Sequence, residues 1–343
     1  MESNTLKKSR VALYQGDDRK VNLHQAIDRV IDEIDWSTRQ QVMVKPNLVR
    51  ESRHYAITHR DALATVLEKI RERYNGHLTI AEGCAKTSTI AAFKAQRYDE
   101  LARFYNCRLL DLNADDIVPV VLYDRLTRPL HLRVSRTLIK SDCRVSLSLP
   151  KTHNAVLVTL SIKNMIMAAL VNRRITKFGK YQAWIDRAGQ IIKGHGNGWG
   201  SDKVAMHQSY PIMNLNLALL VPLVRPHLSI LDGFVAMEGD GPIDGEPVDW
   251  KIAVAGTDPL AVDILTARLM GFDINEIGYL SYCTQLNLGS SSSEEVDVVG
   301  NVLPDSVARP FKLPPAYQQQ RQWSNTIVRQ LFQSRKISLE MKL

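Results

Sequence analysis

Short apolar runs alternate with longer stretches of helical periodicity along the first third of the chain. The apolar runs are rich in β-branched residues and end in polar turns, which is typical of strands. They lie at 11–14, 41–45, 77–81 and 108–111. Between them, apolar side chains recur three and four positions apart, as on helices that bury one face. These stretches lie at 23–34, 59–74 and 90–106. Strands that alternate with helices in this way predict βαβ units with right-handed crossovers.

The same alternation returns in the second half of the chain. Strands are predicted at 144–149, 227–232 and 250–255, and helices at 214–223 and 258–270. Residues 119–134 alternate apolar and polar positions, which indicates a hairpin. We therefore predict an α/β fold with a mostly parallel, doubly wound sheet.

Two segments depart from this alternation. Residues 171–206 are rich in Gly, Arg and Lys, which predicts an inserted segment or lid outside the core. Near the C-terminus, apolar residues from Trp323 to Phe332 recur at helical spacing among basic ones, which predicts a basic amphipathic helix. We expect an α/β body at 1–303, followed by a linker and tail at 304–343.

Composition is that of an ordinary globular protein, since 45% of the 343 residues are hydrophobic and 23% are charged. These proportions exclude the disordered and collagenous classes. The first ten residues lack the apolar stretch of a signal peptide, so we expect a cytoplasmic protein.

The net charge of +8 comes mostly from one end of the chain. From Arg309 to Leu343 there are seven basic residues and one acid, which leaves the preceding residues nearly neutral. The body therefore lacks the basic surface that nucleic acid binding requires, and no nucleic acid partner is expected. Residues 316–343 are instead a candidate for peripheral contact with a membrane or another protein.

The four cysteines are far apart in the sequence, and no two of them form C-x-x-C. They are Cys84, Cys107, Cys143 and Cys283. This spacing argues against a ferredoxin-type site, so no iron–sulfur cluster is expected.

Polar and charged side chains follow several of the predicted strands. Lys45 and Asn47 end the strand at 41–45, and Lys151 and His153 follow the strand at 144–149. In open α/β sheets the carboxyl ends of the strands form the ligand-binding crevice. We therefore expect these side chains to converge at one site.

A second polar group lies in the apolar run that follows, where Thr159, Lys163 and Asn164 are spaced to share one helical surface. A lysine in an apolar run is costly unless it is paired, which favours a functional role for Lys163. We predict that His153 and Lys163 are catalytic. The residues predicted to bind a small anionic substrate, phosphate or carboxylate, are Lys45, Asn47, Lys151, Thr159 and Asn164.

Acidic residues and glycines gather between Asp232 and Gly245. The spacing of the acids does not fit an EF-hand, but carboxylates are the ligands that hard divalent cations prefer. We predict that Asp232, Glu238 and Asp240 hold a divalent metal ion, whose identity the sequence leaves open.

These features favour an enzyme that binds a small anion at the carboxyl edge of the sheet, and they leave two alternatives open. The first is a redox metalloprotein with non-haem iron on His153, His207 and a carboxylate. The second is a non-catalytic binding module anchored by its tail.

The sequence resembles a family of bacterial and archaeal proteins named domain of unknown function family 362. The stretches that carry the resemblance are Val44-Lys-Pro-Asn-Leu48, Thr58-His59, Glu82-Gly83, Leu149-Pro-Lys-Thr-His153, Thr159-Leu-Ser-Ile-Lys-Asn164, Asp232-Gly233, Ala236-Met-Glu-Gly-Asp-Gly-Pro242 and Thr257-Asp-Pro-Leu-Ala-Val-Asp263. The resemblance implies more about fold than about function. Some members carry a ferredoxin-like module with C-x-x-C cysteines, which this chain lacks.

Overall fold

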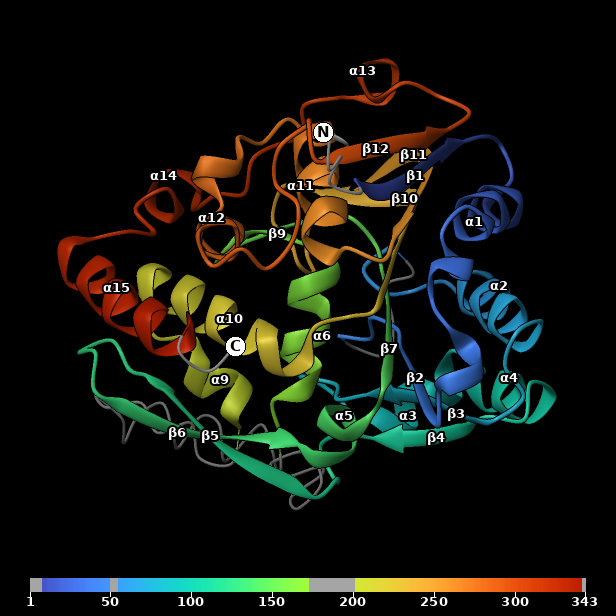
Figure 1. The fold of residues 1–343 in the computed structure, drawn as a ribbon, viewed down its shortest axis with the longest axis horizontal. Coiled ribbons are helices and arrows are strands. Elements are labelled where there is room, and N and C mark those ends of the chain that lie inside the picture. Colours follow the sequence, from blue (N-terminus) through green and yellow to red (C-terminus); the bar gives the residue numbers. More distant parts are fainter. Residues whose placement is uncertain (1–7, 50–54, 173–200, 341–343) are drawn as a thin grey trace, which may run out of the picture.

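A ten-stranded mixed sheet forms the centre of the computed structural model, which describes residues 8–49, 55–172 and 201–340 (Figure 1). The main path of the sheet runs in the order β12-β1-β11-β10-β7-β2-β3-β4, and the short strands β8 and β9 attach beside β10. The strands are β1 (Ser9–Gln15), β2 (Gln41–Lys45), β3 (His77–Glu82), β4 (Arg108–Asp111), β7 (Cys143–Ser148), β8 (Lys151–His153), β9 (Leu157–Thr159), β10 (Leu228–Glu238), β11 (Glu246–Gly256) and β12 (Val296–Gly300). Strands β4, β3, β2, β7 and β10 are parallel, whereas β11 is antiparallel to both of its neighbours. The predicted mostly parallel α/β fold is confirmed.

Helices cover both faces of this sheet because successive side chains of a strand point to opposite faces. In β1, Val11 and Leu13 join one apolar cluster, while Ala12 and Tyr14 join the other. The first cluster also includes residues of α6 (Ser161–Ala169), α10 (Tyr210–Val224), α11 (Pro259–Leu269) and α12 (Gly278–Gln285). The second includes residues of α1 (Arg19–Asp28), α2 (Arg60–Arg71), α3 (Thr89–Ala95) and α4 (Tyr98–Phe104). The doubly wound arrangement follows from these two cores.

Some predicted elements differ in extent from the observed ones. The single helix predicted at 90–106 is two helices, α3 and α4, because Arg97 adopts a left-handed conformation with φ 56° between them. The predicted hairpin forms a separate two-stranded sheet of β5 (Ile117–Tyr123) and β6 (Pro129–Ser135), followed by α5 (Arg136–Lys140). Strand β10 continues past Asp232 to Glu238, since it keeps pairing with β11 in a long hairpin.

Of the predicted insertion at 171–206, residues 173–200 lie outside the described part of the chain. Residues 201–206 are described, and they belong to the body of the fold. Asn172 and Ser201 form a β-bridge, and α9 (Asp202–Met206) follows it. Met206 is fully buried in the same apolar cluster as α6.

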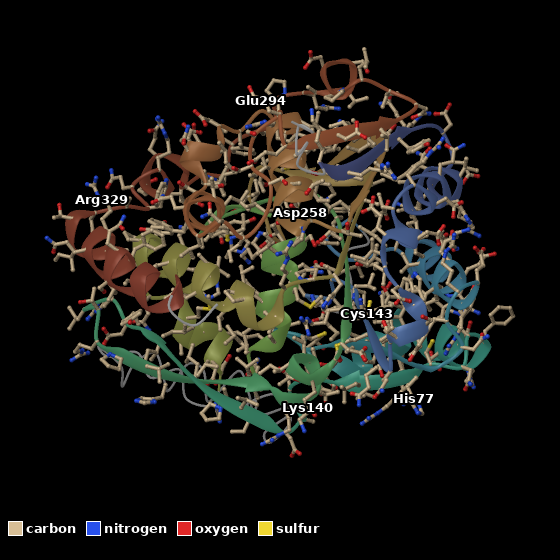
Figure 2. The ribbon with its side chains drawn as sticks, in the orientation of Figure 1. His77, Lys140, Cys143, Asp258, Glu294 and Arg329 are labelled. Atoms are coloured by element: carbon tan, nitrogen blue, oxygen red, sulfur yellow. The ribbon has the colours of Figure 1, made fainter. Side chains whose placement is uncertain are left out.

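The C-terminal segment contains α13 (Pro304–Val307), α14 (Tyr317–Gln320) and the predicted amphipathic helix, α15 (Thr326–Glu340). Val328 and Phe332 of α15 are buried, and the Phe332 ring lies 4.6 Å from the ring of Tyr282 in α12. Arg329 projects outward from the same helix (Figure 2). The apolar side of α15 therefore packs on this chain's own helices. A membrane or protein contact through residues 316–343 stays a prediction, as does a domain boundary near 303.

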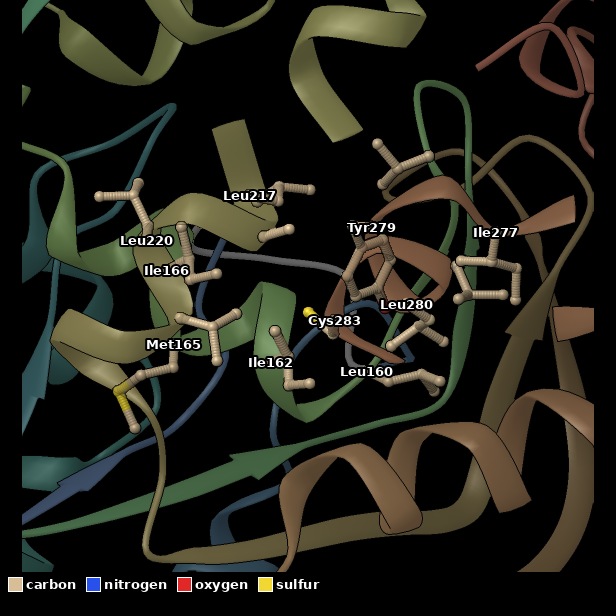
Figure 3. Packing of buried hydrophobic residues seen from close by; sticks show 14 of the residues in the cluster. Leu160, Ile162, Met165, Ile166, Leu217, Leu220, Ile277, Tyr279, Leu280 and Cys283 are labelled. Atoms are coloured by element: carbon tan, nitrogen blue, oxygen red, sulfur yellow. The ribbon is translucent and has the colours of Figure 1, made fainter. Parts of the chain in front are cut away.

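Helix α6 lies within the larger apolar cluster, packed against α10 and close to residues of α12 (Figure 3). Its first two backbone N–H groups donate to the carboxylate of Asp263, from Ser161 N to Oδ1 at 2.8 Å and from Ile162 N to Oδ2 at 3.0 Å. A carboxylate at a helix N-terminus satisfies free donors and interacts favourably with the helix dipole. Asp263 is itself fully buried. The cap thus holds the start of α6 at a fixed place in the core.

Within the described ranges, no helix has both the length and the apolar character that crossing a membrane requires.

Replacing Asp263 with Asn tests this cap. The substitution keeps the size of the side chain but turns one acceptor oxygen into an amide donor that faces a backbone N–H. We expect the free energy of unfolding in urea to fall by about 1–3 kcal/mol, the cost of an unsatisfied buried group. The matched control is Asp273→Asn, because exposed Asp273 caps a short helix and Asn is an equally good cap. Equal losses in the two variants would contradict the assigned role of Asp263.

Candidate functional site

A cavity of about 350 Å³ lies at the carboxyl ends of the adjacent strands β2 and β3. Residues of β8, β9, α6 and α9 complete its wall. The seven residues predicted to be catalytic or to bind substrate all line it. They are Lys45, Asn47, Lys151, His153, Thr159, Lys163 and Asn164. The structure therefore brings the whole polar cluster together, and the roles of its members stay predictions.

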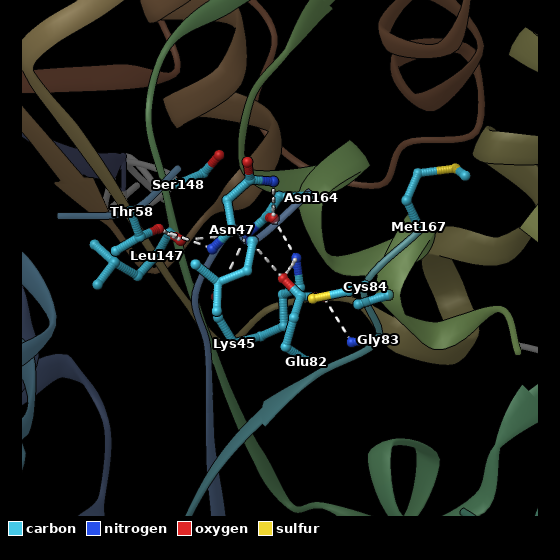
Figure 4. A network of polar contacts seen from close by, with 12 residues as sticks. Lys45, Asn47, Thr58, Glu82, Gly83, Cys84, Leu147, Ser148, Asn164 and Met167 are labelled. Carbon is cyan, nitrogen blue, oxygen red and sulfur yellow. Dashed lines mark hydrogen bonds and ion pairs between the residues drawn. The ribbon is translucent and has the colours of Figure 1, made fainter. Parts of the chain in front are cut away.

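Asn164 is the centre of a hydrogen-bond network at the floor of the cavity (Figure 4). Its Oδ1 accepts from Lys45 Nζ and, at 2.8 Å, from Asn47 Nδ2. Its Nδ2 donates to Ser146 Oγ of β7 at 3.0 Å. One amide on α6 thereby ties β2 to the neighbouring strand β7 and sets the positions of Lys45, the last residue of β2, and of Asn47, which follows that strand.

Glu82, at the end of β3, is a buried carboxylate to which the sequence analysis gave no catalytic or binding role. Its Oε2 lies 3.0 Å from Lys45 Nζ and accepts from Leu48 N at 2.7 Å, while its Oε1 accepts from Gly83 N at 2.7 Å. Among the described residues that line the cavity it is the one acidic side chain. The sequence signal that could have identified Glu82 as a site residue is its position directly after the predicted strand at 77–81.

Lys151 also has protein partners for its ammonium group. Its Nζ donates to Asn47 Oδ1 at 2.7 Å and to the backbone oxygen of Ala56 at 2.9 Å. The side chain is fully buried. Burial lowers the pKa of Lys151 well below its usual range, and the charges of Lys163 and Lys45 lower it further.

Lys203 is a second cavity residue that the sequence analysis missed, because it falls in the segment predicted to be a lid. Its Nζ donates to backbone oxygens at the C-terminal end of α6, those of Met167, Ala168 at 3.3 Å and Leu170 at 2.5 Å. A cation at this end complements the helix dipole. Burial lowers the pKa of Lys203 to about 8.

Lys163 differs from these lysines. It lies in the first turn of α6 and is 5% exposed, and no hydrogen bond or ion pair joins its ammonium group to any described residue. Burial lowers the pKa of Lys163 to about 7, and the nearby charges of Lys45 and Lys203 act in the same direction. At neutral pH this side chain is therefore present in comparable amounts as an ammonium and as a neutral amine.

Two histidines line the cavity in opposite tautomers, as their partners assign them. His153 Nδ1 accepts from Ala155 N at 2.9 Å, so its ring proton is on Nε2. His207 Nδ1 lies 2.6 Å from the Lys203 carbonyl, which can only accept, so its proton is on Nδ1 and Nε2 is bare. Burial and the charge of Lys163 lower the pKa of both, that of His207 to about 4. Both imidazoles are therefore neutral, and the pair offers one hydrogen-bond donor and one acceptor.

The residues predicted to hold a metal ion are not brought together. Asp232 points to the face of the sheet that carries α1, where its Oδ2 lies 3.1 Å from Arg19 Nε. Glu238 Oε2 accepts from the backbone N–H of Lys312 at 3.0 Å, and Asp240 is exposed. None of the three lines the cavity. In the part of the chain that is described, no group of three or more His, Cys, Asp or Glu side chains could hold a metal ion, and this includes the set of His153, His207 and a carboxylate.

Replacing Lys163 with Met tests the environment of this amine. The folded-state pKa is about 7 and the ordinary value is 10.5, so the unfolded chain binds the proton more tightly. The buried amine of Lys163 therefore lowers the free energy of unfolding of the wild type by its full amount below pH 7, and this destabilisation disappears by pH 10.5. We expect Lys163→Met to raise the free energy of unfolding at pH 6 by up to about 5 kcal/mol, at about 1.4 kcal/mol per pKa unit, and to lose this gain as pH rises.

The matched control for this series is Lys140→Met, because Lys140 is an exposed lysine on α5. Its effect on unfolding should change little between pH 6 and pH 10. If the two variants gave parallel pH profiles, the buried and unpaired state of Lys163 would be disproved.

Comparison with known proteins gives a family, a protein similar in sequence and a solved structure similar in part of its fold. The family model described as Domain of unknown function (DUF362) matches residues 42–268. A thylakoid-associated protein of Synechocystis sp. is 25% identical over 164 residues, which are 48% of this chain and 43% of the relative, so this chain spans less than half of that relative's length. The lactate racemase apoprotein from Thermoanaerobacterium thermosaccharolyticum is 13% identical with a TM-score of 0.42, covering 81% of this chain and 57% of that one. With the family model matching well over half of its residues, this chain belongs to the DUF362 family.

Proposed function

We propose that this chain is an enzyme that binds a small carboxylate or phosphate in the cavity and transfers a proton there. The observation that carries the proposal is the balance of charge. Five described lysines line the cavity, of which Lys86 is exposed and the other four are each at most 5% exposed, and Glu82 is the one acidic side chain among the described lining residues. Glu82 forms its ion pair with Lys45, and no ion pair joins the other three buried lysines to a carboxylate of the described residues.

A bound anion would relieve this imbalance. The lowered pKa values of Lys151, Lys163 and Lys203 show that holding several ammonium groups in this buried space is unfavourable. An anionic group beside Lys163 would favour its charged form and would form charge-assisted hydrogen bonds with it. The volume of about 350 Å³ is at the small end of ligand sites, which supports a small molecule.

The histidine pair supports proton transfer as the chemistry. Nε2 of His207 can take a proton, and Nε2–H of His153 can donate a hydrogen bond to an oxygen that gains charge. Positive charge from Lys163 helps to hold the pKa of His207 near 4. A bound anion would offset that charge, so His207 becomes a stronger base when the substrate is present.

Titration calorimetry with inorganic phosphate and with pyruvate tests the proposal. We expect wild type to bind at least one of these anions, and we expect Lys163→Met to weaken the binding by more than about tenfold, since it loses a charge-assisted hydrogen bond. Lys140→Met makes the same charge change outside the cavity and should bind as wild type does. If neither anion binds, or if the two variants weaken binding equally, the proposal fails.

A second variant separates binding from chemistry. His207→Asn can keep a donor to the Lys203 carbonyl while removing the ring nitrogen that accepts the proton. We expect it to bind pyruvate like wild type but to lose the uptake of deuterium from D2O into the pyruvate methyl group, measured by proton NMR. Undiminished deuterium uptake would contradict the role of His207.

A further inference from the structure

Three of the four buried lysines in the cavity are held by protein groups, whereas no residue of the described ranges holds Lys163. Lys45 is bound by Glu82 and Asn164, Lys151 by Asn47 and the Ala56 carbonyl, and Lys203 by carbonyls of α6. No described residue accepts a hydrogen bond from Lys163 Nζ, although its side chain lines the same cavity. A buried ammonium group without an acceptor is unfavourable, so the neutral amine suits this position.

Several groups around Lys163 favour the neutral amine over the ammonium form. The residue lies in the first turn of α6, where the helix dipole is positive. The charges of Lys45 and Lys203 act on it, and the two nearest titratable rings, His153 and His207, are neutral. A neutral amine carries a free electron pair and is a nucleophile toward carbonyl carbon. The pKa of about 7 keeps a large share of Lys163 in this form at neutral pH.

We propose that Lys163 forms an imine with the carbonyl carbon of a small 2-oxo carboxylate. This inference rests on the proposed function, because the cationic cavity is what selects a carbonyl compound that also carries an anionic group. A 2-oxo carboxylate places its carbonyl next to its carboxylate, so one small molecule can meet both the nucleophile and the lysines around it. The inference thus narrows the substrate class from any small anion to one that contains a reactive carbonyl.

The step balances without an oxidant or a reductant. The electron pair of Lys163 Nζ forms the C–N bond, and the carbonyl electron pair moves to oxygen. A proton of the new ammonium passes to Nε2 of His207 and from there to that oxygen, which gives a neutral carbinolamine. The nitrogen electron pair then forms the C=N bond as the C–O bond breaks, and the departing hydroxyl takes a second proton, supplied by solvent through His207, and leaves as water. Nε2–H of His153 can hydrogen-bond the oxygen while it is negative. The protonated imine that remains withdraws electrons from the adjacent carbon, which is the position where a proton would then be removed.

Reductive trapping tests the inference directly. Wild-type protein is treated with sodium borohydride in the presence of pyruvate, 2-oxobutanoate or glyoxylate, and the products are measured by intact mass and peptide mapping. We expect one adduct per chain with at least one of these acids. Because trypsin cleaves after unmodified lysine, an adduct on Lys163 would join the peptides 152–163 and 164–173 into one. Adducts spread over surface lysines, or none with any of the acids, would overturn the inference.

Lys163→Arg is the matched variant, since it keeps a positive charge but cannot form an imine. It should lose the adduct. Lys140→Met is the control outside the cavity, and borohydride should trap the same adduct on it as on wild type. Binding of inorganic phosphate separates the proposed anion-binding function from the proposed imine, because phosphate is an anion without a carbonyl group. Phosphate binding without an adduct would reject the imine and leave the proposed function standing, whereas loss of both would reject the proposed function as well.

Discussion

The site depends on a short helix, α6, that the protein holds in its interior by a buried side chain at each end. Asp263 accepts from the first N–H groups of the helix, and Lys203 donates to its last carbonyls. The positive charge of Lys203 has the sign that the helix dipole favours at the C-terminal end of a helix, whereas burial raises the pKa of Asp263 to about 8, so Asp263 acts mainly as a hydrogen-bond acceptor. Between these ends the helix presents Lys163 and Asn164 to the cavity. A helix fixed in this way lets two polar side chains occupy positions in an otherwise apolar core.

The arrangement of charged groups and their hydrogen-bond partners then determines the protonation state of each lysine that lines the cavity. Asn164 and Glu82 fix the ammonium group of Lys45, and Asn47 fixes that of Lys151. The acceptor atoms of the cavity floor are thus occupied by Lys45 and Lys151. Burial lowers the pKa of Lys163, and the charges of Lys45 and Lys203 lower it further. Groups with pKa values shifted by burial and by a specific charge neighbour are typical of functional sites, although structural ion pairs produce shifts as well. The opposite tautomers of His153 and His207 place one hydrogen-bond donor and one acceptor in this cavity.

Sequence reasoning located the site because strands β7, β2 and β3 are parallel neighbours, so the residues that follow them meet at one edge. Lys163 was identifiable as a lysine in an apolar run. The same reasoning failed for Asp232, because a strand residue faces one side of the sheet or the other. Asp232 points to the side of α1, where Arg19 pairs with it. It also missed Lys203, because a Gly-rich and basic sequence predicts a lid and gives no sign that its last residues return to the core. His207, which the sequence offered only as a ligand of an alternative iron site, follows directly after that segment.

The most direct test of this account is an NMR titration of the lysine side chains, labelled with ¹³C at Cε, in the full-length protein. The signal that disappears in Lys163→Met identifies Lys163. The account predicts that this signal titrates with a pKa of about 7, and that a bound anion moves its titration to higher pH. A signal from Lys163 that titrates near the ordinary lysine value of about 10.4, and that does not respond to an anion, would contradict it.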